Sequence, residues 1–307
     1  MKTSATTRGL LTGLAAVLLF GITVVMQAML VAEGIKPFTA VGIRYLWSGL
    51  VCILILLVLR RPVLPVRGER TATILLGAFV YGIQAVLFYA ALGHGTVASV
   101  SLLFYTYPVI VLVASLALGL RRWTPVAGGS AALSVIGAAL VVAAGRQVAI
   151  DWTGILMAFG SACCVAVFLL ANARLLPRTS ALAAAAWVSF GVAISTLSIA
   201  AAQGDLHNVS MRAWVILIAA GATTGLGTVA MYVTLSTLGP PPTSVILSLQ
   251  TVVAIIGSAL VLGQPIFLGQ VFGGIAILGA IVLMATKGRP KPDPGGLVPV
   301  EEQPTHE

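Results

Sequence analysis

The run GLLTGLAAVLLFGITVVMQAMLVA, residues 9 to 32, holds no charged side chain and decides the class of this protein. A helix of about 20 apolar residues is long enough to cross the hydrocarbon of a bilayer. Lys2 and Arg8 precede the run, as basic residues precede the core of a signal peptide. Such a core spans only about 7 to 15 residues. We therefore interpret residues 9 to 32 as a retained transmembrane helix.

Nine further apolar runs follow, separated by charged or Pro- and Gly-rich breaks. Each run is continuously apolar, whereas a strand of a transmembrane barrel would alternate in polarity over about ten residues. The sequence therefore predicts an all-α membrane protein of ten transmembrane helices. The predicted spans are 9–32, 38–59, 71–93, 97–120, 124–144, 152–173, 181–202, 213–238, 243–263 and 266–286.

The composition excludes a water-soluble domain. Hydrophobic residues make up 59% of the 307 residues and charged residues only 8%, against about 25% charged in a typical soluble domain. The net charge of +9 does not indicate nucleic-acid binding, because the bases separate the apolar runs instead of clustering on one solvated face. All eight acids lie outside the predicted spans, at Glu33, Glu69, Asp151, Asp205, Asp293, Glu301, Glu302 and Glu307.

The distribution of bases predicts the orientation. With a cytoplasmic N-terminus, the inner segments hold thirteen Lys and Arg residues and the outer loops hold three, Lys36, Arg146 and Arg212. Cytoplasmic loops of membrane proteins carry such an excess. We therefore expect both termini in the cytoplasm. From residue 287 the chain is rich in Pro, Gly and charge, which predicts a disordered cytoplasmic tail over 287–307.

The two halves of the chain repeat each other. Thr12-Gly13-Leu14 opens the first span as Thr153-Gly154-Ile155 opens the sixth, and Leu118-Gly119 ends the fourth as Leu262-Gly263 ends the ninth. The offsets, 141 and 144 residues, agree. Units with an odd number of helices are inserted in opposite orientations, and such inverted repeats build transporters with a central site. The predicted organisation is 1–8 as a cytoplasmic N-terminus, 9–144 and 152–286 as five-helix repeats, and 287–307 as the tail.

Four stretches carry a resemblance to a known superfamily. They are Phe20-Gly21, Pro37 through Arg44-Tyr45-Leu46, Thr96-Val97-Ala98-Ser99 through Tyr107-Pro108, and Leu262-Gly263-Gln264. Over nearly residues 8 to 286 the chain resembles the drug/metabolite transporter superfamily, in particular proteins with two EamA domains.

The resemblance implies a ten-helix bundle that works by alternating access in a bacterial cytoplasmic membrane and, as in many relatives, exports amino acids or related metabolites. The cargo does not follow from the fold. The pattern departs from the family at Leu120 and Gln264, where relatives usually have Glu, and at Val252, where a Pro is expected.

Polar side chains grouped on helix faces are the candidate cavity lining, because polar groups in a bilayer are costly unless they are satisfied. Tyrosine, with an apolar face and a polar tip, suits a large neutral or aromatic amino acid. Pro108 frees a backbone carbonyl one turn earlier, and in a transporter such a break can bend the helix around a substrate. For each residue the alternative is interhelical hydrogen bonding, an interfacial aromatic belt or, for Pro108, a packing kink. The candidates are Gln27; Tyr81, Gln84 and Phe88; Ser101, Tyr105 and Pro108; Thr224, Thr228 and Tyr232; and Ser244, Ser248 and Thr251.

Arg44 is the one base well inside a predicted span. It would contact a substrate carboxylate, or else extend outward to the interface or cap backbone carbonyls. His94, at the outer end of the third span, lies in a loop and is interpreted as incidental.

The absence of acids from the spans favours facilitated transport, because proton-coupled carriers commonly use a membrane-embedded carboxylate. We predict no enzyme activity, since no nucleophile with an acid/base pair lies in the spans. We also predict no metal, no cofactor and no disulfide.

The expected partners are a small-molecule substrate and the lipid bilayer, without nucleic acid; the oligomeric state stays open, a monomer being the simplest case. The alternative function is a non-transporting membrane sensor or assembly protein.

Overall fold

The computed structural model describes residues 2–117, 125–145, 150–175, 178–205, 209–238, 246–247 and 249–287. Over these residues the chain is a bundle of helices without a β-strand, apart from one isolated bridge between Gly95 and Ile150. The prediction of an all-α fold is confirmed.

The first half of the chain supplies five spans, two of them interrupted. Pro37 opens the second span, as expected of a residue whose missing N–H is not needed in the first helical turn. The elements are α1 (Lys2–Ala32), α2 (Pro37–Val58), α3 (Arg70–Leu75) with the π-helix η1 (Leu76–Tyr81) and α4 (Gly82–Leu92), α5 (Val97–Phe104) with α6 (Tyr107–Ala117), and α7 (Pro125–Gly145).

The second half repeats this series. Gly263, with φ of 63°, ends α12 in the left-handed conformation that Gly adopts without a Cβ penalty. The elements are α8 (Trp152–Leu175), α9 (Ala181–Ala202), α10 (Met211–Leu238), α12 (Gln250–Leu262) and α13 (Leu268–Lys287).

Three helices differ from the predicted spans. The first begins at Lys2 instead of residue 9, so it extends beyond its apolar run. The third contains the π-helical turn η1, which hydropathy cannot reveal. In the ninth, residues 246–247 are helical but α12 begins only at Gln250, several residues after the predicted start.

The fourth span is broken at Tyr105 and Thr106, just before Pro108. The N–H groups of Val109 and Ile110 both donate to Thr106 O, at 3.0 and 3.2 Å. Pro108 has no N–H to continue the helical ladder. The predicted break in this helix is therefore present.

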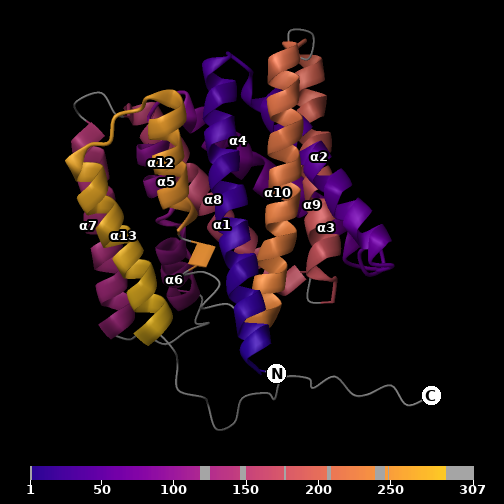
Figure 1. Ribbon diagram of the computed structural model, residues 1–307, viewed down its shortest axis with the longest axis horizontal. Helices are drawn as coiled ribbons and strands as arrows, with labels where there is room; N and C mark the ends of the chain where they lie inside the picture. The colour runs from indigo at the N-terminus through magenta and orange to yellow at the C-terminus, as the bar shows by residue number, and fades with distance from the viewer. Residues whose placement is uncertain are drawn as a thin grey trace.

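The helices pair between the two halves. α1 packs along α10 while α4 packs on α8, and α2 packs on α9 while α7 packs on α13. Exchanging each helix with its counterpart in the other half leaves this pattern unchanged, because the pair of α1 with α10 then becomes the pair of α8 with α4, as a two-fold relation between the repeats requires. Figure 1 shows α7 and α13 together at one edge of the bundle and α2 with α9 at the opposite edge.

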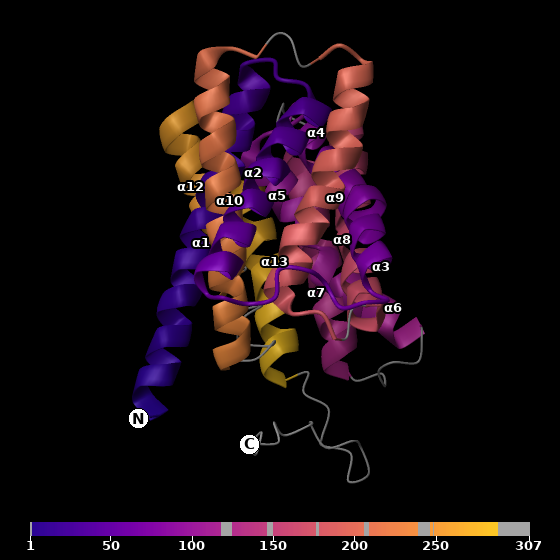
Figure 2. The same cartoon turned by 90° about the vertical axis from the view of Figure 1, so that its right-hand side faces the viewer.

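The outside of the bundle is apolar. Among the described residues, five helices are long and apolar enough to cross a membrane, and five shorter apolar helical stretches accompany them. Large hydrophobic side chains such as Leu54, Leu260 and Phe272 are exposed along them, as expected of a surface that faces lipid. The start of α1 and the end of α13 lie at the same end of the bundle (Figure 2), as an even number of spans requires.

Candidate functional site

Three buried polar side chains lie on α1, α5 and α12, helices that pack against one another. Gln27, Ser101 and Thr251 are at most 4% exposed. Gln27 Oε1, Ser101 Oγ and Thr251 Oγ1 have no hydrogen-bond partner among the described residues. A buried polar atom without a partner costs about 1 to 3 kcal/mol. We call Gln27, Ser101 and Thr251, with Tyr105, the α1–α5–α12 polar set.

Tyr105 connects this set to a group of aromatic rings. It lies at the break between α5 and α6, beside Thr251 of α12. Its ring centroid is 5.7 Å from that of Phe104 and 5.9 Å from that of Tyr107, and Phe104 lies 5.0 Å from Phe88 of α4. The break in the fourth span thus brings flat apolar faces next to unpartnered oxygens.

Arg44 occupies a second polar region, between α2 and α10. Its side chain is 6% exposed, so the alternative in which it extends outward to the interface is wrong. Nη1 donates to Thr224 Oγ1 at 3.4 Å, and the guanidinium carbon lies 4.3 Å from the centre of the Tyr45 ring. Tyr81 and Tyr89 lie in its neighbourhood, whereas Nε is buried without a hydrogen-bond partner among the described residues.

The contacts of Arg44 do not compensate its charge. Desolvating an ion costs several kcal/mol in a protein, and a cation–π contact returns about 0.5 to 2 kcal/mol. No salt bridge of Arg44 to an acid is present among the described residues. Because arginine stays protonated in proteins, the chain carries an unbalanced positive charge in this region.

Other predicted site residues make hydrogen bonds within the bundle. Gln84 Nε2 donates to Ser161 Oγ of α8 at 2.9 Å, and Ser161 Oγ donates to Gln84 O at 3.0 Å. Thr228 Oγ1 donates to Thr224 O of its own helix. For Gln84 the alternative of interhelical packing holds.

Residues that were predicted to share one helix face therefore lie in different surroundings. Of the third-span face, Tyr81 lies with Tyr45 and Phe168, Gln84 bonds to α8, and Phe88 joins the aromatic group. Tyr232 lies in the neighbourhood of Tyr81, which is also near Arg44. Ser244 and Ser248 lie outside the described residues.

The arrangement matches a known transporter family. The family model described as "EamA-like transporter family" matches residues 7–143 and again residues 152–286. The chain belongs to the EamA-like transporter family. It is therefore a multi-pass integral membrane protein and a transporter of the drug/metabolite type, built from two copies of the family's unit.

Solved structures support the fold of this EamA-like transporter. Of the 18 chains that match, one, described only as "Crystal structure of protein", has a TM-score of 0.63 at 16% sequence identity and covers 92% of this chain and 96% of its own. At that identity the likeness establishes the fold alone. No curated protein matches.

Two glutamines outside the predicted site residues hold the start of α5 in this EamA-like transporter, one from α13 and one from the loop before it. Gln264 Oε1 accepts the N–H of Val97 at 2.9 Å. Gln270, 2% exposed, donates through Nε2 to Thr96 Oγ1 at 3.0 Å and Ser99 Oγ at 2.7 Å. An amide oxygen thus satisfies a first-turn N–H of α5 at the position where relatives carry Glu.

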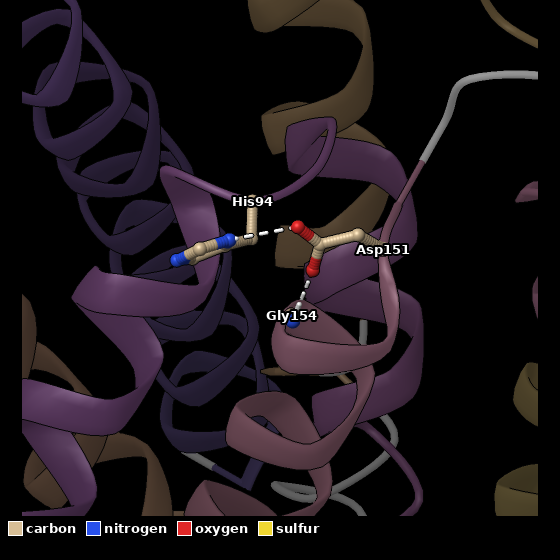
Figure 3. A network of polar contacts seen from close by, with 3 residues as sticks. All are labelled: His94, Asp151 and Gly154. Atoms are coloured by element: carbon tan, nitrogen blue, oxygen red, sulfur yellow. Dashed lines mark hydrogen bonds and ion pairs between the residues drawn. The ribbon is translucent and has the colours of Figure 1, made fainter.

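His94 makes an exposed side-chain contact that the sequence did not reveal. Its Nδ1 lies 2.9 Å from Asp151 Oδ2, while Gly154 N donates to Asp151 Oδ1 at 2.7 Å (Figure 3). The Gly154 N–H and the His94 ring hold the pKa of the Asp151 carboxyl below its ordinary value. The partner is 57 residues away in the sequence, which is why the sequence did not reveal it.

A pocket of about 430 Å³ opens beside the fourth span, between α6, α7 and α8. Its walls are almost entirely apolar, from Val109, Ile110, Val135 and Phe159 among others. It contains neither Arg44 nor the α1–α5–α12 polar set, so it is not the predicted cavity. Within the described ranges, no group of three His, Cys, Asp or Glu side chains is placed to hold a metal ion.

Proposed function

We propose that this transporter moves an amino acid with a large neutral or aromatic side chain across a bacterial cytoplasmic membrane, with both termini in the cytoplasm. Transport is facilitated export by alternating access, without proton coupling. The observation that carries the proposal is the α1–α5–α12 polar set, in which three buried oxygens on three helices that pack together have no hydrogen-bond partner among the described residues. A polar substrate would supply the missing hydrogen bonds.

The surroundings of the polar set support an aromatic or large neutral cargo. Tyr105, Phe104, Tyr107 and Phe88 present their rings at centroid separations of 5.0 to 5.9 Å. Aromatic rings interact favourably with other flat apolar groups at such separations. The break between α5 and α6 lies in the same group, and broken helices are typical of transporter binding sites.

The sequence supports the uncoupled mechanism. None of its eight carboxylic acids lies within a predicted span. A proton-coupled carrier commonly needs such a carboxylate as its relay. The sorting of bases, thirteen inside against three outside, supports the orientation.

The test is uptake of radiolabelled amino acids into liposomes that contain the purified protein, with and without an imposed proton gradient. We expect protein-dependent uptake of at least one large neutral or aromatic amino acid without a gradient. Thr251→Val removes one unpartnered hydroxyl while keeping the shape of the side chain. It should lower the initial rate roughly tenfold, the equivalent of one hydrogen bond to the substrate.

Thr237→Val is the matched control, because Thr237 is exposed and its hydroxyl donates only to carbonyls of its own helix. Its rate should stay within about twofold of the parent. Uptake that requires a gradient would overturn the uncoupled mechanism, and uptake of no amino acid would overturn the cargo class. Equal rates in Thr251→Val and Thr237→Val would overturn the α1–α5–α12 polar set as the binding site.

A further inference from the structure

We propose that Arg44 is a carboxylate-recognition site inside the bundle, and that the cargo must carry a single carboxylate while an amine lacking one is rejected. The inference rests on the proposed function in one respect, that cargo passes between these helices. It adds the chemical group by which the cargo is recognised.

The buried position of Arg44 removes its charge from water, so the charge requires an anion in its place. It lies seven residues after Pro37, the first residue of α2, hence about 10 Å along the helix from the outer end at 1.5 Å per residue. It is 6% exposed. Arginine cannot lose its proton to escape the cost of burial. Buried charges in membrane proteins normally pair with an opposite charge.

The hydrogen bonds of Arg44 within the bundle leave N–H donors free to bind that anion. A guanidinium has five N–H donors, and one side-chain bond of Arg44 is present among the described residues, the 3.4 Å contact from Nη1 to Thr224 Oγ1. Thr224 donates its own hydroxyl hydrogen to Ala220 O at 2.7 Å, so its oxygen is free to accept from Arg44. Within the same residues, the buried Nε has no hydrogen-bond partner.

The planar guanidinium favours a carboxylate. Its parallel N–H groups match the two oxygens of a carboxylate and bind them in pairs. Among the described residues, the neighbours of the guanidinium include no second cation; they are Tyr45, Tyr81, Tyr89 and Thr224. A phosphate or a dicarboxylate would bring a second negative charge without a partner, so one carboxylate balances the site.

The same charges reject an amine. No predicted span contains an acid, so an ammonium group alone would meet Arg44 without any opposing carboxylate. Like charges in a region of low dielectric repel strongly. In an amino acid, the carboxylate next to Arg44 offsets this repulsion.

The test is ligand binding to the purified full-length protein in detergent, measured as the shift in thermal unfolding. The probes are L-phenylalanine, 3-phenylpropionate, which keeps the carboxylate and lacks the ammonium, and 2-phenylethylamine, which lacks the carboxylate. We expect a saturable rise in Tm with 3-phenylpropionate and L-phenylalanine but none with 2-phenylethylamine. An equal shift with the amine, or no shift with either carboxylate, would sink the proposal.

Arg44→Gln should abolish the shift with 3-phenylpropionate, whereas Arg67→Gln, at an exposed residue of the inner loop, should leave it unchanged. Should Arg44→Gln not purify as a single species, Arg44→Lys carries the test: it keeps the charge but loses the paired N–H groups. Its half-saturating concentration should rise at least about tenfold. An unchanged concentration would contradict the assignment.

The two proposals fail separately. Binding in detergent does not depend on flux, gradient or orientation. A protein that binds 3-phenylpropionate through Arg44 but moves no amino acid into liposomes refutes the proposed transport and leaves this inference standing. A protein that transports amino acids equally well with Arg44→Gln refutes the inference alone.

Discussion

The threonine hydroxyls in the helices of this protein show three hydrogen-bonding patterns. Thr228 donates to its own helix, whereas Thr23 and Thr223 reach each other across α1 and α10 at 2.7 Å. Thr251 has no partner among the described residues. Hydrogen bonds between membrane helices contribute about 0.6 to 2 kcal/mol each. At the scale of the residue, buried polar atoms that packing leaves without a hydrogen bond indicate function.

Asp151 supports a prediction about pH. Its carboxyl has a pKa lowered from the ordinary 3.8, chiefly by the Gly154 N–H and then by His94. A lowered pKa in the folded state stabilises the protein above the ordinary value, and the contribution is lost as the pH falls through the lowered pKa. We expect Asp151→Asn to have a lower Tm than the parent at pH 6 in detergent, with the difference shrinking between pH 4 and pH 2.

Asp205→Asn is the control for this prediction, because it removes the carboxylate of another loop. Its Tm relative to the parent should not follow the pattern of Asp151→Asn. A difference between Asp151→Asn and the parent that stays constant from pH 6 to pH 2 would show that the ionised Asp151 carboxylate does not stabilise its loop.

At the scale of the element, hydropathy does not reveal the π-helical turn η1, whereas the geometry of the packed helices does. Gly77 of η1 lies against the carbonyl of Val188 in α9, and Gly191 of α9 lies against the carbonyl of Ile74 in α3. The backbones therefore touch at two glycines, one from each half of the chain. π-helical turns are frequent at functional sites, and Tyr81 at the end of η1 lies with Tyr45, next to Arg44.

Gly77→Ala should destabilise the protein by about 1 to 3 kcal/mol, because the added Cβ would overlap backbone atoms of Val188 that cannot rotate away. The measurement is thermal unfolding in detergent. Gly129→Ala in α7 is the matched control: no atom lies within 4 Å of its added Cβ, so it should be neutral or stabilising. Equal Tm values for the two variants would contradict the close contact of η1 with α9.

At the scale of the whole molecule, charged side chains join the two halves at both ends. At one end, Glu69 accepts from Thr179 Oγ1 at 2.6 Å and from Thr179 N at 2.9 Å. At the opposite end, Glu33 pairs with Arg212 Nε at 3.0 Å and accepts from Ser210 Oγ at 3.1 Å. Both contacts flank α2 and α9, so this edge of the bundle is held on both sides of the membrane.

The orientation of the molecule is tested with single cysteines in a variant whose three native cysteines are replaced. Gln203→Cys and Arg67→Cys place exposed thiols at opposite ends of the bundle. With cytoplasmic termini, a membrane-impermeant thiol reagent should label Gln203→Cys in intact spheroplasts and label Arg67→Cys only after permeabilisation. The reverse result would invert the topology and would leave the fold unchanged.

Local chemistry determined much of this protein from its sequence. Hydropathy over windows of about 20 residues predicted the helical class and the ten spans, because each helix must satisfy its own backbone in lipid. Pro108 predicted the break in the fourth span, and short motifs such as Leu262-Gly263-Gln264 indicated the family. The repeat followed from spacing alone.

The tertiary structure decided which polar residues are left for a ligand. Gln84 and Gln27 are equivalent in the sequence, but Gln84 meets Ser161, 77 residues away, whereas Gln27 Oε1 meets no partner among the described residues. The sequence did not decide whether Arg44 reaches the membrane interface or the interior of the bundle. In the structure its side chain is buried beside Thr224 of α10. Satisfaction of a polar atom depends on atoms within about 3 Å, and in this bundle those atoms come from distant helices.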